Sequence, residues 1–186
     1  MDENKIESLK VDPNFDFELV MGLMQETRLG GQVLEDMVKT FERWIPHLHA
    51  VLLRAGGKKY VALWLDEAVE EEVDTEFDRS SEKGFRLNCV GQAMIMNAVY
   101  QLIPEVEDAG CAPAPKPTDE LAEVLEEAGV PYLDGRTGLT RRFSVLTGYP
   151  FKGACDICFL REDCPKANGS NESSFSSFEL PGHVRQ

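Results

Sequence analysis

Apolar residues recur at intervals of three and four in two stretches near the start of the chain. The first stretch contains Phe17, Val20, Met21 and Met24, and the second contains Val33, Met37, Phe41 and Trp44. This spacing predicts two amphipathic helices, because residues so placed share one helix face. Asp16 is a suitable cap for the first helix, glycines 30 and 31 separate the two, and Pro46 ends the second. We therefore expect a helical hairpin.

Two β-like runs follow this region, at residues 48–54 and 60–65. Both are mainly apolar, and the sequence Ala-Gly-Gly-Lys lies between them. Glycines tolerate the positive backbone angles that a tight turn requires, so the pattern predicts a β-hairpin.

The segment from Asp66 to Lys83 is acidic and has one narrow apolar stripe, which predicts a surface helix that ends at Gly84. The next segment, residues 85–103, is apolar almost all round and predicts a central buried helix. Three prolines in CAPAPKPT predict a stiff, extended linker. A helix capped by Thr118 should end at Gly129, VPYL is a candidate short strand, and Leu139, Phe143 and Leu146 predict a last helix between Thr137 and Gly148.

These elements predict an α+β fold that is mainly α-helical, with one β-hairpin and a C-terminal cysteine-rich metal-binding loop. We expect a single domain over residues 1–166, with the loop at 153–166. Residues 167–186 are rich in serine and asparagine and are expected to form a disordered tail.

The chain is strongly acidic, with a formal net charge of -14 over 186 residues. Residues 1–130 carry 27 acidic and 12 basic side chains, whereas residues 131–186 carry six and seven. Such charge repels phosphate backbones, so nucleic-acid binding is not expected. No apolar run is long enough to cross a bilayer and the first residues do not resemble a secretory signal, so we expect a cytoplasmic protein without a membrane partner.

Three of the five cysteines are bunched within ten residues, as Cys155-Asp-Ile-Cys158 followed by Cys164-Pro. A bunch of this kind in a reducing compartment is typical of metal binding rather than of a disulfide framework. Thiolates suit zinc and iron-sulfur centres. A zinc module usually shows a second Cys-x2-Cys or a histidine pair at matching spacing, and neither is present, so we favour an iron-sulfur cluster over zinc.

Both kinds of centre need a fourth ligand unless one position stays open for chemistry, and Cys89 and Cys111 compete for it. Cys89 is expected at the start of the buried helix, where the helix dipole favours a thiolate. Cys111 follows Gly110 in an irregular segment that can bend toward a ligand. The predicted site is thus Cys89, Cys155, Cys158 and Cys164, with Cys111 as the alternative fourth ligand.

The run GACDICFLREDCPK, about residues 153–166, is similar to the cluster loop of CRISPR-associated RecB-like nucleases, in which a distant upstream cysteine completes a 4Fe-4S site. It also resembles the endonuclease III family of DNA glycosylases, although those enzymes have a further cysteine where this chain has Gly148. The resemblance implies a cluster and not an activity. RecB-like nucleases also hold magnesium with an Asp and a Glu-x-Lys, and YVALWL lacks the latter, with only Asp66 at its end.

Three functions follow from these observations. The first is a small iron-sulfur protein in electron transfer or redox sensing, which needs a redox or other protein partner. The second is an accessory or interaction module with a structural zinc or iron-sulfur site. The third is an enzyme acting on nucleic acid, which the acidity disfavours. His47 and His49 would share one face of a strand, but they are interpreted as a solvated pair rather than as metal ligands.

Overall fold

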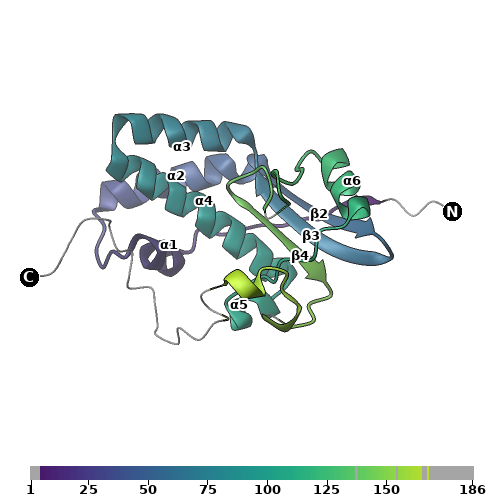
Figure 1. The fold of residues 1–186 in the computed structure, drawn as a ribbon. Helices are drawn as coiled ribbons and strands as arrows, with labels where there is room; N and C mark the ends of the chain where they lie inside the picture. Colours follow the sequence, from purple (N-terminus) through teal and green to yellow (C-terminus); the bar gives the residue numbers. More distant parts are fainter. Residues whose placement is uncertain (1–4, 137, 154, 165–166, 168–186) are drawn as a thin grey trace, which may run out of the picture.

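A computed structural model describes residues 5–136, 138–153, 155–164 and 167 (Figure 1). The α-helices are α1 (Phe17–Met24), α2 (Gly31–Trp44), α3 (Glu67–Arg79), α4 (Ser81–Leu102), α5 (Glu105–Ala109) and α6 (Asp119–Glu127). The strands are β1 (Ile6–Ser8), β2 (Leu48–Ala55), β3 (Lys58–Leu65) and β4 (Ser144–Tyr149). Short 3₁₀ turns lie at Ile45–His47, Cys155–Ile157 and Arg161–Asp163. No helix of the described part is long and apolar enough to span a membrane.

The strands form one antiparallel sheet in the order β1-β2-β3-β4. The predicted hairpin is confirmed as its centre, with Leu48 opposite Leu65 and Ala55 opposite Lys58. Gly56 and Gly57 make the turn at positive φ angles of 56° and 73°, which glycine adopts without strain. The expectation of α+β architecture is also confirmed, but β1 and β4 extend the hairpin into a four-stranded sheet.

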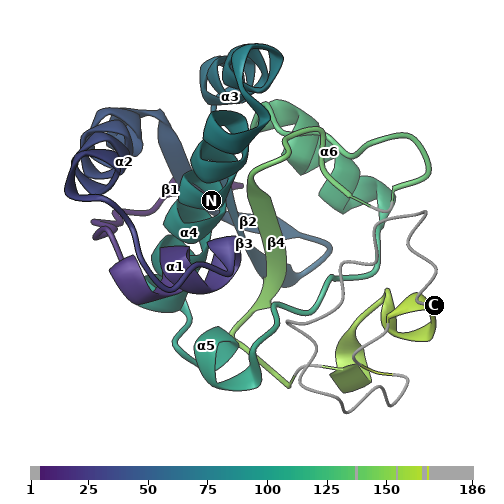
Figure 2. The same cartoon turned by 90° about the vertical axis from the view of Figure 1, so that its left-hand side faces the viewer.

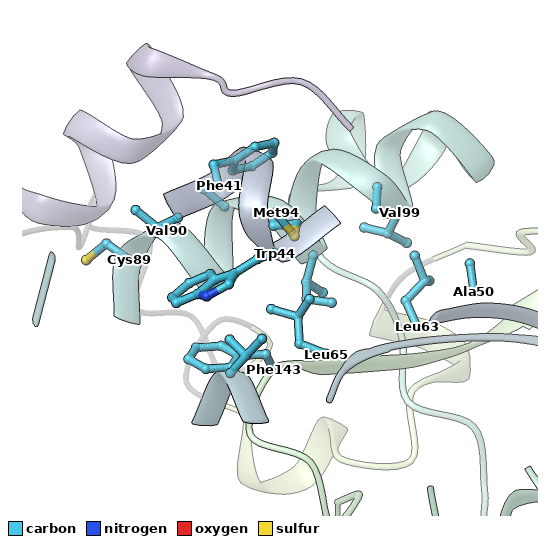
Figure 3. Close-up of a cluster of buried hydrophobic side chains, with 14 of the residues drawn as sticks. Phe41, Trp44, Ala50, Leu63, Leu65, Cys89, Val90, Met94, Val99 and Phe143 are labelled. Atoms are coloured by element: carbon cyan, nitrogen blue, oxygen red, sulfur yellow. The ribbon is translucent and has the colours of Figure 1, made fainter. Parts of the chain in front are cut away.

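Both faces of the sheet are covered, which explains why β3 is apolar along most of its length. One face packs under α1, α2, α3 and α4, whereas α6 covers the other (Figures 1 and 2). Successive β3 side chains point to opposite faces of the sheet. Those of Val61, Leu63 and Leu65 lie in the larger core. Tyr60, Ala62 and Trp64 join the smaller core against α6. Figure 3 shows the larger core, where Trp44, Met94 and Phe143 meet.

The predicted helix between Thr137 and Gly148 is wrong, because Ser144–Tyr149 is the strand β4. Six of its residues pair with β3, from Lys59 opposite Tyr149 to Trp64 opposite Ser144. Leu139, Phe143 and Leu146 are spaced as in a helix, yet Phe143 packs in the larger core and Leu139 in the smaller one. The open edge of β3 supplies hydrogen bonds that outweigh the local pattern. Of the VPYL segment, Tyr132 makes an isolated bridge with Leu139.

The expected helix boundary at Gly84 is also wrong, because α3 ends at Arg79 and α4 begins at Ser81. The Ser80 side chain caps α4 by accepting from the Lys83 amide. Gly84 instead serves packing, since a Cβ there would lie 2.7 Å from the Phe77 Cα. The glycine thus marks the close approach of α3 and α4 and not the end of a helix.

The predicted linker lies outside the helices and strands, and a buried hydrogen bond holds it to the sheet. Residues 112–118 contain no helix or strand. The Thr147 hydroxyl on β4 is fully buried and donates to the Pro113 carbonyl at 3.0 Å. The linker then leads to α6, where the Thr118 hydroxyl accepts from the Leu121 amide as predicted. Apart from Ala167, the expected C-terminal tail lies outside the described residues.

Candidate metal centre

Consecutive tight turns carry the three bunched cysteines. The Cys158 amide donates to the Cys155 carbonyl, and the Cys164 amide donates to the Arg161 carbonyl. Between these turns the Arg161 amide donates to the Cys158 carbonyl, so an i to i+3 pattern repeats along the loop. In this geometry residues three apart lie on the same side of the backbone. The loop therefore brings Cys155 and Cys158 to neighbouring positions on one side.

The thiols of this loop lie at the surface. Cys155, Cys158 and Cys164 are each half-buried, and none of the five cysteines is joined in a disulfide. Within the described residues, no group of three or more His, Cys, Asp or Glu side chains is close enough together to hold a metal ion. The donor types nevertheless fit a soft metal centre, because accessible thiols can lose their protons when a metal binds. Ala154, Pro165 and Lys166, which belong to the predicted loop, lie outside the described residues.

Cys89 occupies a different environment from the one expected. It lies more than two turns inside α4, which begins at Ser81, so the dipole at the helix start does not reach it. Its side chain is 2% exposed and belongs to the larger core, where Figure 3 shows it beside Val90. Burial raises the pKa of its thiol to about 11. This position suits a neutral thiol that packs as a small apolar side chain.

Cys111 lies in the segment that touches the cysteine loop. It directly follows Gly110, which ends α5 in the left-handed conformation. Three residues further on, the Ala114 carbonyl accepts from the Phe159 amide at 2.9 Å. Phe159 itself directly follows Cys158, so the chain after Cys111 is hydrogen-bonded to the loop that carries the other thiols. Cys111 is half-buried, like those thiols.

His47 and His49 meet one carboxylate, an arrangement that no pattern in the sequence indicated. His47 Nδ1 lies 3.1 Å from Asp66 Oδ2, and His49 Nε2 lies 2.6 Å from Asp66 Oδ1. The Asp66 amide also donates to the His47 carbonyl, and the His49 ring stacks on Trp64. The β2–β3 register brings Leu48 opposite Leu65. The start of β2, with His49 in it and His47 just before it, therefore lies beside the end of β3, which Asp66 directly follows. The carboxylate therefore orients the two imidazoles at the end of the hairpin.

The structure also contains a hollow of about 160 Å³ next to the cysteine loop, which the sequence did not predict. Its walls come from the linker, the turn before β4, β4 itself and the loop, and they include Tyr132, Arg136 and Phe159. These segments are separated by many residues and follow no local motif. No sequence pattern could therefore have grouped them.

Comparison with known proteins found no relative of this chain. No protein-family model, no curated protein and no solved structure matches the chain.

Proposed function

We propose that this protein is a small iron-sulfur protein that holds a 4Fe-4S cluster at Cys155, Cys158 and Cys164 and acts in electron transfer or redox sensing. The observation that carries the proposal is the run of tight turns at 155–164, which offers three half-buried cysteines within ten residues. Thiolate ligands are what such clusters use. When bound, the cluster would supply one-electron redox chemistry.

We further propose Cys111 as the fourth ligand, in place of the Cys89 that the sequence favoured. The hydrogen bond between the Phe159 amide and the Ala114 carbonyl supports this choice, because it joins the segment after Cys111 to the loop. Cys89, in contrast, is packed in the larger core with 2% exposure. Bringing Cys89 to the loop would require the core around α4 to open, whereas Cys111 lies in irregular chain that can adjust.

The location of the loop supports a redox role. Its thiols are half-buried, and the neighbouring side chains of Ile157 and Phe159 are exposed to 48% and 45%. A cluster held there would lie near the surface, within reach of a redox partner. Exposed apolar side chains of this size also suit a transient protein contact.

The deciding experiment is an anaerobic purification of the full chain, followed by iron, zinc and acid-labile sulfide analysis and an optical spectrum of the same sample. We expect a brown protein with about four irons and four sulfides per chain. Dithionite should bleach the visible absorption, and an oxidant added under anaerobic conditions should restore it. Such reversible bleaching would support the redox role. A colourless protein with about one zinc would favour a structural accessory module instead, and a protein without metal would refute the proposal.

Three single substitutions test the ligand set. Cys158→Ser should abolish metal binding, and Cys111→Ser should remove most of it. Cys89→Ser is the matched control and should leave the metal content unchanged, although it lowers stability because it places a hydroxyl in the core. Loss of metal in Cys89→Ser, with full retention in Cys111→Ser, would reverse the assignment of the fourth ligand.

A further inference from the structure

The first two cysteines of the loop are the two ends of one hydrogen-bonded turn. A 3₁₀ turn covers Cys155–Ile157, and the Cys158 amide donates to the Cys155 carbonyl at 3.4 Å. In such a turn the backbone rises about 2 Å per residue and residues three apart eclipse, so their Cα atoms lie roughly 6 Å apart. A disulfide needs Cα atoms about 4.4–6.8 Å apart. The turn therefore holds Cys155 and Cys158 at a separation that a disulfide can bridge.

Two of the other cysteines do not share this arrangement. Cys164 also ends a turn, but that turn begins at Arg161, which carries no thiol. Cys89 is 2% exposed in the larger core, so a dissolved oxidant cannot reach it. Cys155 and Cys158 are half-buried and keep part of their surface in contact with solvent, as exchange with a dissolved disulfide requires. The geometry thus favours this one pair.

A bond between these two residues would be easy to reverse. It would close a loop of only four residues, and a disulfide stabilises a fold less when the loop that it closes is shorter. Disulfides near the surface, unlike buried structural ones, are open to attack by small thiols. Every described residue from 155 to 164 is half-buried or exposed, so no tightly packed core would protect the bond. The pair therefore suits a reversible disulfide rather than a permanent one.

We propose that Cys155 and Cys158 form a reversible disulfide when the loop holds no metal, and that this disulfide prevents the cluster from binding. The first part depends on the loop alone. The second part rests on the proposed function, because it takes the same two sulfurs as cluster ligands. A sulfur that is bonded to another sulfur is not a thiolate and cannot act as such a ligand. Oxidation of the loop would thus stop cluster binding, and reduction would restore it.

The oxidant is a small-molecule disulfide such as oxidised glutathione. The deprotonated sulfur of one cysteine attacks one sulfur of the oxidant, which forms a mixed disulfide and releases the first small thiolate. The deprotonated sulfur of the second cysteine then attacks the sulfur of the first and releases the second small thiolate. The two thiolates take up the two protons that the cysteines lost. In total the pair of cysteines loses two electrons and two protons, and the oxidant becomes two small thiols.

The test treats the full chain, stripped of metal by a chelator under anaerobic conditions, with oxidised glutathione. Peptide mapping by mass spectrometry should place a disulfide between Cys155 and Cys158, and dithiothreitol should remove it. Cys155→Ser and Cys158→Ser should each abolish this bond and leave a mixed disulfide with glutathione on the remaining cysteine of the pair. Cys89→Ser is the matched control and should form the disulfide to the same extent as the wild type.

Two results would overturn the proposal. The first is a metal-free wild-type chain in which Cys155 and Cys158 stay unlinked or pair with other cysteines. The second concerns the chain purified anaerobically with its metal in place, which should resist the same treatment. Formation of the disulfide at an equal rate, with the metal retained, would refute the link to cluster binding.

Metal analysis of the anaerobic sample keeps this proposal distinct from the proposed function. A chain purified without iron would refute the cluster, and with it the claim that the disulfide prevents cluster binding. The mapped disulfide in the metal-free chain decides by itself whether Cys155 and Cys158 form a redox-active pair.

Discussion

The sheet with its helices and the cysteine loop are held in place by different kinds of interaction. The sheet has a covered face on each side, and side chains such as Trp44, Leu63 and Phe143 are at most 2% exposed. The loop at 155–164 contains half-buried and exposed residues, and a hydrogen bond from the Phe159 amide to the Ala114 carbonyl joins it to the rest of the chain. Burial therefore fixes the first region, whereas tight turns shape the second and leave its thiols accessible.

This difference has a consequence for how the two regions respond to change. Removing a buried side chain opens a cavity that the surrounding core fills only in part. Removing an exposed one exposes little new surface. We therefore expect large stability effects from the sheet and its helices, and effects on metal content from the loop.

The largest expected effect is at Phe143, which packs against α4 with 2% exposure. Phe143→Ala should lower the free energy of unfolding by about 3–5 kcal/mol, because it leaves a cavity in the larger core. Phe159→Ala, in the loop at 45% exposure, is the matched control and should change it by less than about 1 kcal/mol. Urea unfolding followed by circular dichroism measures both. Similar losses in the two variants would remove the proposed distinction.

The next effect concerns two glycines within helices. A Cβ at Gly84 would lie 2.7 Å from the Phe77 Cα, so Gly84→Ala must push α3 and α4 apart. We expect a loss of about 1–3 kcal/mol. Gly22→Ala in α1 meets nothing within 4 Å and should instead stabilise the protein, by about 0.5–1 kcal/mol. Thermal unfolding of the pair distinguishes packing from helix propensity, and the same sign for both would contradict the packing role of Gly84.

An effect of similar size is expected where the sheet meets the linker. Thr147→Val removes the buried hydroxyl that donates to the Pro113 carbonyl and leaves that acceptor unpaired. The loss should be about 1–3 kcal/mol. Because the linker carries the segment next to Cys111, the variant should also lose metal faster to a chelator than the wild type. Thr140→Val, at an exposed position, is the control and should match the wild type in both measurements.

The smallest effect is a pH dependence at Glu72. Arg43 donates to its carboxylate at 2.6 Å, and this hydrogen bond is the main cause that lowers the pKa of Glu72, with a further bond from the Trp44 ring. A lowered pKa means that the ionised form stabilises the fold at neutral pH and that this contribution is lost as the pH falls below the ordinary value for glutamate.

Glu72→Gln should therefore lower stability at pH 7 by about 1 kcal/mol or less, because Arg43 is half-exposed to solvent. The difference from the wild type should shrink as the pH falls toward 3. Denaturant melts of both proteins across this range provide the measurement. A difference that stays constant with pH would show that the ionised carboxylate is not what stabilises this contact.

Local patterns in the sequence predicted most helices and the hairpin. The spacing of Val20, Met24, Met37 and Phe41 gave α1 and α2 their positions, and Asp16 and Thr118 cap helices as expected. The strand at 144–149 was missed because its hydrogen bonds come from β3, which is far away in the chain. The end of α3 was misplaced because Gly84 was interpreted by its propensity alone, although its packing against Phe77 decides its role.

The candidate site likewise has features that the sequence predicted and features that only the tertiary structure decided. The sequence by itself determined the cysteine bunch and the prediction of a metal centre there, because thiol spacing is local and the ligand types are chemical facts of the side chains. Only the tertiary structure placed Cys89 in the core and joined the chain after Cys111 to the loop. It alone brought Asp66 between two histidines and Tyr132 to Arg136 around one hollow. The physical reason is that burial and proximity depend on how distant segments pack, which no local pattern records.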